Sequence, residues 1–164
     1  ELGHRRLAFA GGTGITPQVE DRWTGFSTAA RAAGVDPERF ENDDWRVTDG
    51  HGVAEALLAR PADERPTGVL AANDLVAIGM ANAYGQHGYR VPNDLSIIGF
   101  DDLAWAAERV VPLTTIRQQR AEIGRLAVTM LLQEIDEGEA HEHRHVVLAP
   151  ELIVRASTAA LPAS

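Results

Sequence analysis

Residues 69–74 read Val-Leu-Ala-Ala-Asn-Asp, and this stretch decides the fold class. Four consecutive apolar residues predict a strand that is buried on both faces of a parallel sheet. Asn73 and Asp74 follow at its carboxyl end, where Asp74 is the expected N-cap of a helix that continues to about residue 84. A buried strand that leads directly into a helix is the repeating unit of α/β proteins.

The same unit recurs on both sides of this stretch. The other expected strands are Leu7–Ala10, Leu95–Phe100, Leu113–Ile116, Val146–Leu148 and Leu152–Val154. The other expected helices run from about Glu20 to Ala33, from Asp49 or Gly50 to about Leu58, and from about Arg120 to Glu137. Apolar runs that alternate with helical spacing predict an α/β fold, with a parallel sheet flanked by helices on both faces.

Length and charge narrow the class of protein. The 164 residues correspond to one domain or to one lobe of a larger protein. Acidic residues number 24 against 15 basic ones, and the net charge of -9 argues against direct DNA binding by this chain. The chain has no Cys, so it forms neither disulfides nor thiolate metal sites. Because no apolar run approaches the ~20 residues that span a bilayer and the first residues do not resemble a signal peptide, we expect no membrane partner and a cytoplasmic location.

Polar residues at strand ends are the first candidates for a ligand site. Ligands of open parallel sheets bind beyond the carboxyl ends of the strands, where this sequence places Asn73 and Asp101. An amide and a carboxylate there can hold sugar hydroxyls or a purine edge, and Trp45 is a candidate aromatic cover. The alternative is that such groups only cap helices and stabilise turns. We favour that alternative for Asp74 and Asp102, and ligand binding for Asn73 and Asp101.

Other chemistries find less support. The loop of residues 11–17 departs from the G-x-G-x-x-G dinucleotide pattern, because a Pro stands where the third Gly is needed. His141, His143 and His145 alternate as metal ligands on a strand would, but without a further carboxylate placed by a rigid element we interpret the tract as a solvated loop. No nucleophile has an obvious base beside it, so we predict no enzyme, no metal site and no cofactor. A small sugar-processing enzyme that uses Asp101 is the rival hypothesis from another class.

An ordered set of motifs points to a known family. The motifs are Leu2–Phe9, Arg22-x-x-Gly25-Phe26, Pro66-Thr67, Ala72-Asn73-Asp74, Val91–Asp102, Pro112–Gln118 and Glu151–Thr158. Together they resemble the effector-binding domain of the LacI/GalR family of bacterial transcription regulators, and they cover nearly the whole chain. Each motif is weak alone, but the collinear set is highly specific.

The resemblance implies a type I periplasmic-binding-protein-like fold, with two α/β subdomains and a small effector between them. We assign residues 1–116 and 146–158 to the second subdomain, and residues 118–138 to a helix of the first subdomain, most of which lies outside this chain. The implied helix-turn-helix domain is also outside it, so operator DNA would be contacted elsewhere in the protein. The apolar stripe of the 118–138 helix then lacks its cover, and we predict that it docks on a second copy of the chain.

The resemblance also implies which residues form the sites. The expected effector contacts are Arg22, Asn73, Asp101, Trp45, Thr16 and Gln18. The expected dimer contacts are Ile78, Ala81 and Asn82, on the helix that follows Asn73. A guanidinium donates in a fixed fork and a carboxylate accepts, so Arg22 and Asp101 together suit vicinal hydroxyls. We therefore favour a sugar over a purine as the effector.

The resulting hypothesis is the effector-sensing and dimerisation portion of a LacI/GalR-type regulator. A small molecule would shift the population of closed and open states and thereby control operator binding by the homodimer. The alternative hypothesis is a sugar-binding receptor of a transport system with the same fold.

Overall fold

The computed structural model describes residues 2–12, 16–41 and 44–161, and it is built around a six-stranded sheet. The strand order is β2-β1-β3-β4-β5-β6, with the first five strands parallel and β6 antiparallel to β5. The strands are β1 (Leu7–Ala10), β2 (Glu38–Phe40), β3 (Gly68–Ala71), β4 (Ser96–Phe100), β5 (Thr114–Arg117) and β6 (Glu151–Ile153). The sheet is therefore mostly parallel, as the apolar runs predict.

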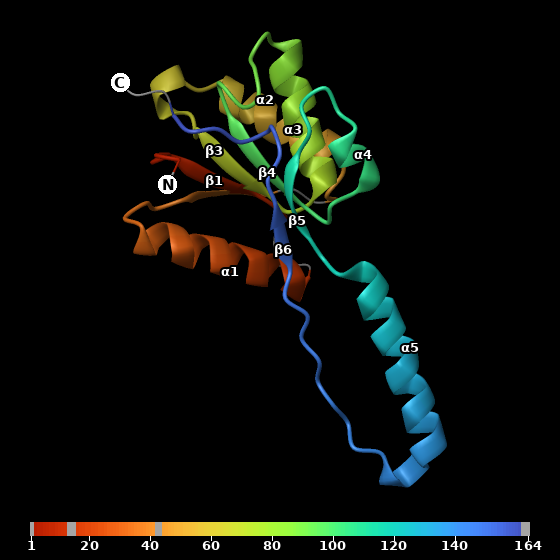
Figure 1. The fold of residues 1–164 in the computed structure, drawn as a ribbon. Coiled ribbons are helices and arrows are strands. Elements are labelled where there is room, and N and C mark those ends of the chain that lie inside the picture. The colour runs from red at the N-terminus through yellow and green to blue at the C-terminus, as the bar shows by residue number, and fades with distance from the viewer. Residues whose placement is uncertain (1, 13–15, 42–43, 162–164) are drawn as a thin grey trace.

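Helices cover both faces of this sheet (Figure 1). They are α1 (Pro17–Ala32), α2 (Val47–Leu58), α3 (Asp74–Gln86), α4 (Ala104–Ala107) and α5 (Arg120–Glu137), with 3-10 turns at Ala62–Glu64 and Gly138–Ala140. The helix α1 lies on one face, and α2 and α3 lie side by side on the other. The predicted α/β fold with helices on both faces is confirmed.

Alternation along the strands divides the core into two layers. Ala8 and Ala10 of β1 belong to the larger cluster beneath α2 and α3. Between them, Phe9 points to the other face and packs against α1, with ring centroids 5.8 Å from Trp23 and 6.1 Å from Phe26. Successive side chains of a strand point to opposite faces, so the strand is buried on both sides and needs apolar residues throughout.

Two glycines set the distance between α2 and α3. A Cβ atom on Gly50 would lie 2.0 Å from the carbonyl oxygen of Val76, and one on Gly79 would lie 2.0 Å from that of Val47. Neither position has room for a methyl group, because the neighbouring atoms belong to the backbone of the partner helix. The close crossing of α2 and α3 therefore depends on these two residues.

The structure corrects several boundaries. The polar stretch after residue 36 contains the edge strand β2, which the sequence did not predict. The helix α1 begins at Pro17 rather than near Glu20, and α2 begins at Val47 rather than at residue 49 or 50. Residues 146–148 are not a strand, and only Glu151–Ile153 pairs with β5. The glycine-rich loop of residues 11–17 is only partly described, because residues 13–15 lie outside the described residues.

The helix α5 and the segment after it extend away from the sheet as a long arm (Figure 1). None of the 18 residues of α5 is buried, and several of its apolar residues, including Ile123, Leu131 and Ile135, are exposed. No described helix combines the length and the hydropathy that crossing a membrane requires.

Candidate functional site

The candidate site lies at the carboxyl ends of β3 and β4, where Arg22 reaches across from α1. Its Nη1 donates to the carbonyl oxygen of Ala72, the residue after β3, at 2.6 Å. Its Cζ atom lies 3.7 Å from the centroid of the Phe100 ring at the end of β4. Its Nη2 is 4.0 Å from Oδ1 of Asp101. The guanidinium is thus held by a carbonyl, an aromatic face and a carboxylate from two neighbouring strand ends.

Asp101 is presented by a tight turn directly after β4. Its backbone has φ +104°, and that of Asp102 has φ +48°, both in the left-handed region that non-glycine residues rarely adopt. The amide of Asp101 donates to the carbonyl oxygen of Ile116 at 2.9 Å, which fixes the turn against β5. Strained backbone of this kind costs about 1–3 kcal/mol per residue and is concentrated at functional sites.

The Asp101 carboxylate is only half used. Oδ1 accepts a hydrogen bond from Nε2 of Gln118 at 2.8 Å, while Oδ2 has no partner among the described residues. The Asp101 side chain is 31% exposed and the Arg22 side chain 18% exposed. The pair therefore offers one free carboxylate oxygen next to a partly exposed guanidinium.

Burial dominates the electrostatics of Arg22. Loss of solvent lowers the pKa of the Arg22 guanidinium, and the neighbouring Asp101 carboxylate acts in the opposite direction by raising it. Because the Arg22 guanidinium is already partly desolvated, binding a polar ligand group would cost it less further loss of hydration.

Asn73 joins the site to its neighbours through both ends of its side chain. Oδ1 accepts from the backbone amide of Val76 at 2.9 Å and caps α3, so the N-cap is Asn73 and not Asp74 as predicted. Nδ2 donates to the carbonyl oxygen of Trp45 at 3.0 Å. In this conformation Asn73 has one free carbonyl lone pair and one free amide hydrogen for a ligand.

Trp45 stands beside Asn73, on the loop before α2. Its backbone has φ +55°, and its ring packs partly against the cores on both faces of the sheet. Nε1 is buried and has no hydrogen-bond partner among the described residues. A buried indole N–H normally finds an acceptor, so an acceptor from a ligand or from another part of the protein would satisfy it.

Thr16 and Gln18 lie at the start of α1. Thr16 is the N-cap residue by position, but its side chain makes no capping hydrogen bond, and its Oγ1 is buried without a partner in the described part of the chain. Gln18 is exposed in the first turn. No hydrogen bond in the described chain connects either side chain to Arg22 or Asp101.

Two further carboxylates have structural roles. Asp74 is fully buried, accepts from Oγ1 of Thr115 at 2.6 Å and from the amide of Leu103 at 2.8 Å, and has a pKa raised by burial. Asp102 accepts from Arg117 and from Arg155, each at 2.6 Å. Burial alone would raise the pKa of Asp102, but these two hydrogen bonds lower it. Each oxygen of both carboxylates therefore has a protein partner, which agrees with a structural role, although Asp74 does not cap α3 as predicted.

The candidate dimer residues line an open groove of about 810 Å³ between α3 and the segment after α4. Ile78 is 3% exposed and belongs to the core, whereas Ala81 is partly exposed and Asn82 is exposed. Oδ1 of Asn82 accepts a hydrogen bond from Arg109, another residue that lines the groove. Next to Arg109, the side chain of Val110 is fully exposed.

The sequence did not single out two residues of the site. Phe100 supports the Arg22 guanidinium, and Gln118 orients the Asp101 carboxylate. Both stand within motifs shared with the LacI/GalR family, next to or near residues that were assigned. Their position in those motifs was the available signal.

Comparison with known proteins identifies the family and supports the fold. A family described as the periplasmic binding protein-like domain matches residues 1–158. The chain belongs to this family. It is 39% identical over 164 residues to the arabinose metabolism transcriptional repressor of Geobacillus stearothermophilus, a match that covers 96% of this chain and 44% of that protein.

Solved structures place this periplasmic-binding-protein-like domain among LacI-type regulators. A LacI family regulator from Enterococcus faecium with bound ribose has a TM-score of 0.89 at 28% identity, covering 98% of this chain and 59% of that one. A Lac repressor dimer bound to operator and an anti-inducer has a TM-score of 0.84 at 30% identity, covering 97% of this chain and 54% of that one.

The domain spans about half the length of the curated relatives it matches. The resemblance to the LacI/GalR family is confirmed, and the relatives are transcriptional repressors rather than enzymes.

Proposed function

We propose that this domain senses a small effector, most simply a sugar, for a cytoplasmic LacI-type regulator that binds operator DNA through another part of the protein. The observation that carries the proposal is the pairing of Arg22 with Asp101 at neighbouring strand ends. The remaining wall of the effector site would come from the first subdomain, to which we also assign α5.

The donor and acceptor arrangement supports a polyol. The free Oδ2 of Asp101 can accept from one hydroxyl while the Arg22 guanidinium donates to the next, which is the requirement of a vicinal diol. The unpartnered indole N–H of Trp45 supplies another donor, and its ring an apolar face. The ribose bound in the Enterococcus faecium regulator supports the same ligand class.

Signalling requires a dimer. We assign the dimer contact to the α3 face that carries Ile78, Ala81 and Asn82, since this face lines an open groove. The Lac repressor is a dimer on its operator, which supports this assembly. Effector binding would favour one arrangement of the two subdomains and thereby change how the dimer presents its DNA-binding domains.

The test is calorimetric titration of the intact protein with D-ribose, L-arabinose, adenosine and hypoxanthine. Asp101→Asn removes the charge but keeps a residue type that tolerates positive φ, and Arg22→Lys removes the planar fork. The matched controls are Asp36→Asn and Arg31→Lys, an exposed ion pair at the C-terminal end of α1.

We expect one of the sugars to bind, and each site variant to weaken that binding at least tenfold while the controls leave it unchanged. Unchanged sugar binding by Asp101→Asn would refute the site assignment. Binding of hypoxanthine or adenosine alone would refute the sugar and retain the effector site. Conversion of a sugar to a product, abolished by Asp101→Asn, would instead support the rival hypothesis of a sugar-processing enzyme that uses Asp101.

A further inference from the structure

The end of the α5 arm brings together three side chains that can ligate a metal. Glu134 lies in the last turns of α5, and His141 and His143 lie on the segment that returns from it. One ligand atom from each of the three residues lies within 4.8 Å of the other two. This cluster is on the arm, and it does not include any residue of the Arg22–Asp101 site.

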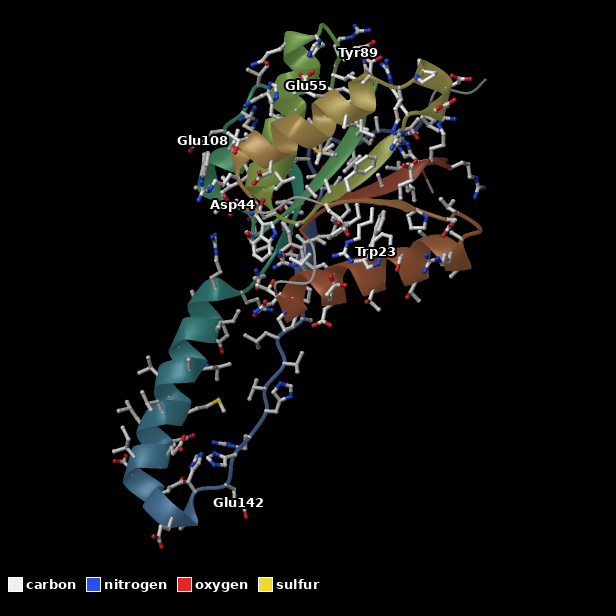
Figure 2. All side chains as sticks on the ribbon, turned by 180° about the vertical axis from the view of Figure 1, so that it is seen from behind. Trp23, Asp44, Glu55, Tyr89, Glu108 and Glu142 are labelled. Carbon is white, nitrogen blue, oxygen red and sulfur yellow. The ribbon has the colours of Figure 1, made fainter. Side chains whose placement is uncertain are left out.

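The backbone at the end of the arm creates this arrangement. The helix α5 ends at Glu137, and Gly138 follows with φ +55°, a conformation that favours glycine. A single 3-10 turn, Gly138–Ala140, then reverses the chain, and the amide of His141 donates to the carbonyl oxygen of Gly138 at 3.1 Å. In Figure 2, side chains of the helix and of the returning segment gather beside each other near the labelled Glu142.

Two side-chain contacts hold the returning segment against the helix. Nδ1 of His141 pairs with Oε2 of Glu137 at 2.7 Å. Nη2 of Arg144 donates to Oε1 of Gln133 at 2.6 Å. The two contacts lie on either side of His143, so the segment is fastened both before and after the second candidate ligand.

The surroundings of the His141 imidazole resemble those of metal-ligating histidines. Its side chain is only 6% exposed, although it lies on an arm with no buried helix residue. Because Glu137 engages Nδ1, the other ring nitrogen, Nε2, is left to bind a cation. A carboxylate on the far nitrogen fixes the orientation of a ligating imidazole. The His143 ring is 5.4 Å away, centroid to centroid.

We propose that Glu134, His141 and His143 bind a divalent transition-metal ion, with Zn²⁺ the best match for two imidazoles and one carboxylate. Ligand atoms of a tetrahedral Zn²⁺ site are about 3.3 Å apart, given Zn–N bonds of about 2.0–2.1 Å. Since Glu134 and His143 are exposed, rotation of their side chains toward His141 would contract the present cluster to that size. Three protein ligands leave the fourth position for water or for a donor from another part of the protein.

The sequence alone argued against this site, because no carboxylate on a rigid element accompanied the His tract. The fold supplies that carboxylate from α5. The ion would fasten the returning segment to the helix and so stiffen the arm that leads back to β6. His145, the third residue of the alternating tract, is not a member of the cluster.

The experiment is a Zn²⁺ titration of the metal-free intact protein, in competition with a chromogenic chelator. The site variants are His141→Ala, His143→Ala and Glu134→Gln. The matched controls are His145→Ala in the same tract and Glu142→Gln beside it. All five positions lie on the exposed arm away from the core, and circular dichroism confirms that each variant is folded.

We expect one Zn²⁺ per chain with a dissociation constant in the micromolar range or below, and at least a tenfold loss of affinity in His141→Ala and in His143→Ala. Glu134→Gln should weaken binding, and the two controls should not. Two results would overturn the proposal: no saturation at one equivalent, or an equal loss in His145→Ala, which would indicate a nonspecific His-rich tract.

Discussion

The helices α3 and α5 differ sharply in burial. Eight of the 13 residues of α3 are buried between the sheet and α2, whereas none of the 18 residues of α5 is buried. Both sequences are helical and both carry apolar side chains, so amphipathic pattern alone does not distinguish them. The stability of α3 derives from tertiary packing within the described chain, while the apolar face of α5 requires a surface from elsewhere.

The largest effect is expected where α2 and α3 cross. Gly79→Ala should destabilise the domain by at least about 3 kcal/mol, since the added methyl group would meet the carbonyl of Val47. Its control is Gly85→Ala on the same helix, where nothing lies within 4 Å and the better helix former should stabilise by about 0.5–1 kcal/mol. Urea unfolding followed by circular dichroism measures both values. Equal stability of the two variants would show that the helices cross less tightly than described.

A pair of identical substitutions tests the comparison directly. Leu57→Ala, on α2 and fully buried in the same core cluster as α3, should cost about 2–5 kcal/mol in the free energy of unfolding. Leu131→Ala, on α5 and 56% exposed, should cost less than about 0.5 kcal/mol when residues 1–164 are measured at a concentration low enough to keep the chain monomeric. In the intact protein the cost at Leu131 should rise above about 1 kcal/mol if the first subdomain covers α5. A small cost there as well would contradict our assignment of this helix.

A smaller effect should separate two adjacent carboxylates. Asp102→Asn weakens the hydrogen bonds from Arg117 and Arg155 that tie β5 and the chain after β6 to the end of β4, and should cost about 2 kcal/mol. Asp101→Asn should cost less than about 1 kcal/mol, because its carboxylate is only half used by the protein. Thermal unfolding of both variants provides the comparison. A larger loss in Asp101→Asn would reverse the roles we assign.

The smallest expected effect is a change in acid sensitivity. The pKa of Asp102 is lowered in the folded state from its ordinary value of 3.8. Below about pH 4 to 5 the unfolded state therefore binds more protons than the folded state, and the free energy of unfolding decreases as the pH is lowered. Asp102→Asn removes this contribution, and its stability should therefore fall less steeply between pH 5 and pH 3. Asp74 acts oppositely, because its raised pKa favours protonation of the folded state. Parallel stability curves for the variant and the parent would contradict the prediction.

The central strands are the elements that a continuous apolar signal predicted correctly. The strands β1, β3 and β4 were found because each is buried on both faces. The edge strand β2 was missed because Glu38 and Arg39 make it locally polar, and its pairing with β1 is what fixes its conformation. Local composition therefore predicts central strands better than edges, where one side of the strand has no neighbour.

The candidate site was predictable to a similar extent. Arg22 and Asp101 were singled out, and the fold brings them to 4.0 Å although they are far apart in the chain. Phe100 and Gln118 were not singled out. An aromatic residue at a strand end and a Gln after a strand do not by themselves indicate a ligand site. Their roles arise only from the juxtaposition of β4 and β5.

The sequence by itself determined the α/β class, the strand-end location of the polar residues and the family, because these depend on periodicity and on motifs that are local in the chain. Only the tertiary structure decided how far the protein itself uses each carboxylate. Both oxygens of Asp102 accept from arginines, whereas only one oxygen of its neighbour Asp101 has a hydrogen-bond partner among the described residues. It also decided that Glu134 meets the His tract, through a reversal at Gly138. Contacts between distant segments depend on the path of the whole backbone, and no local pattern encodes that path.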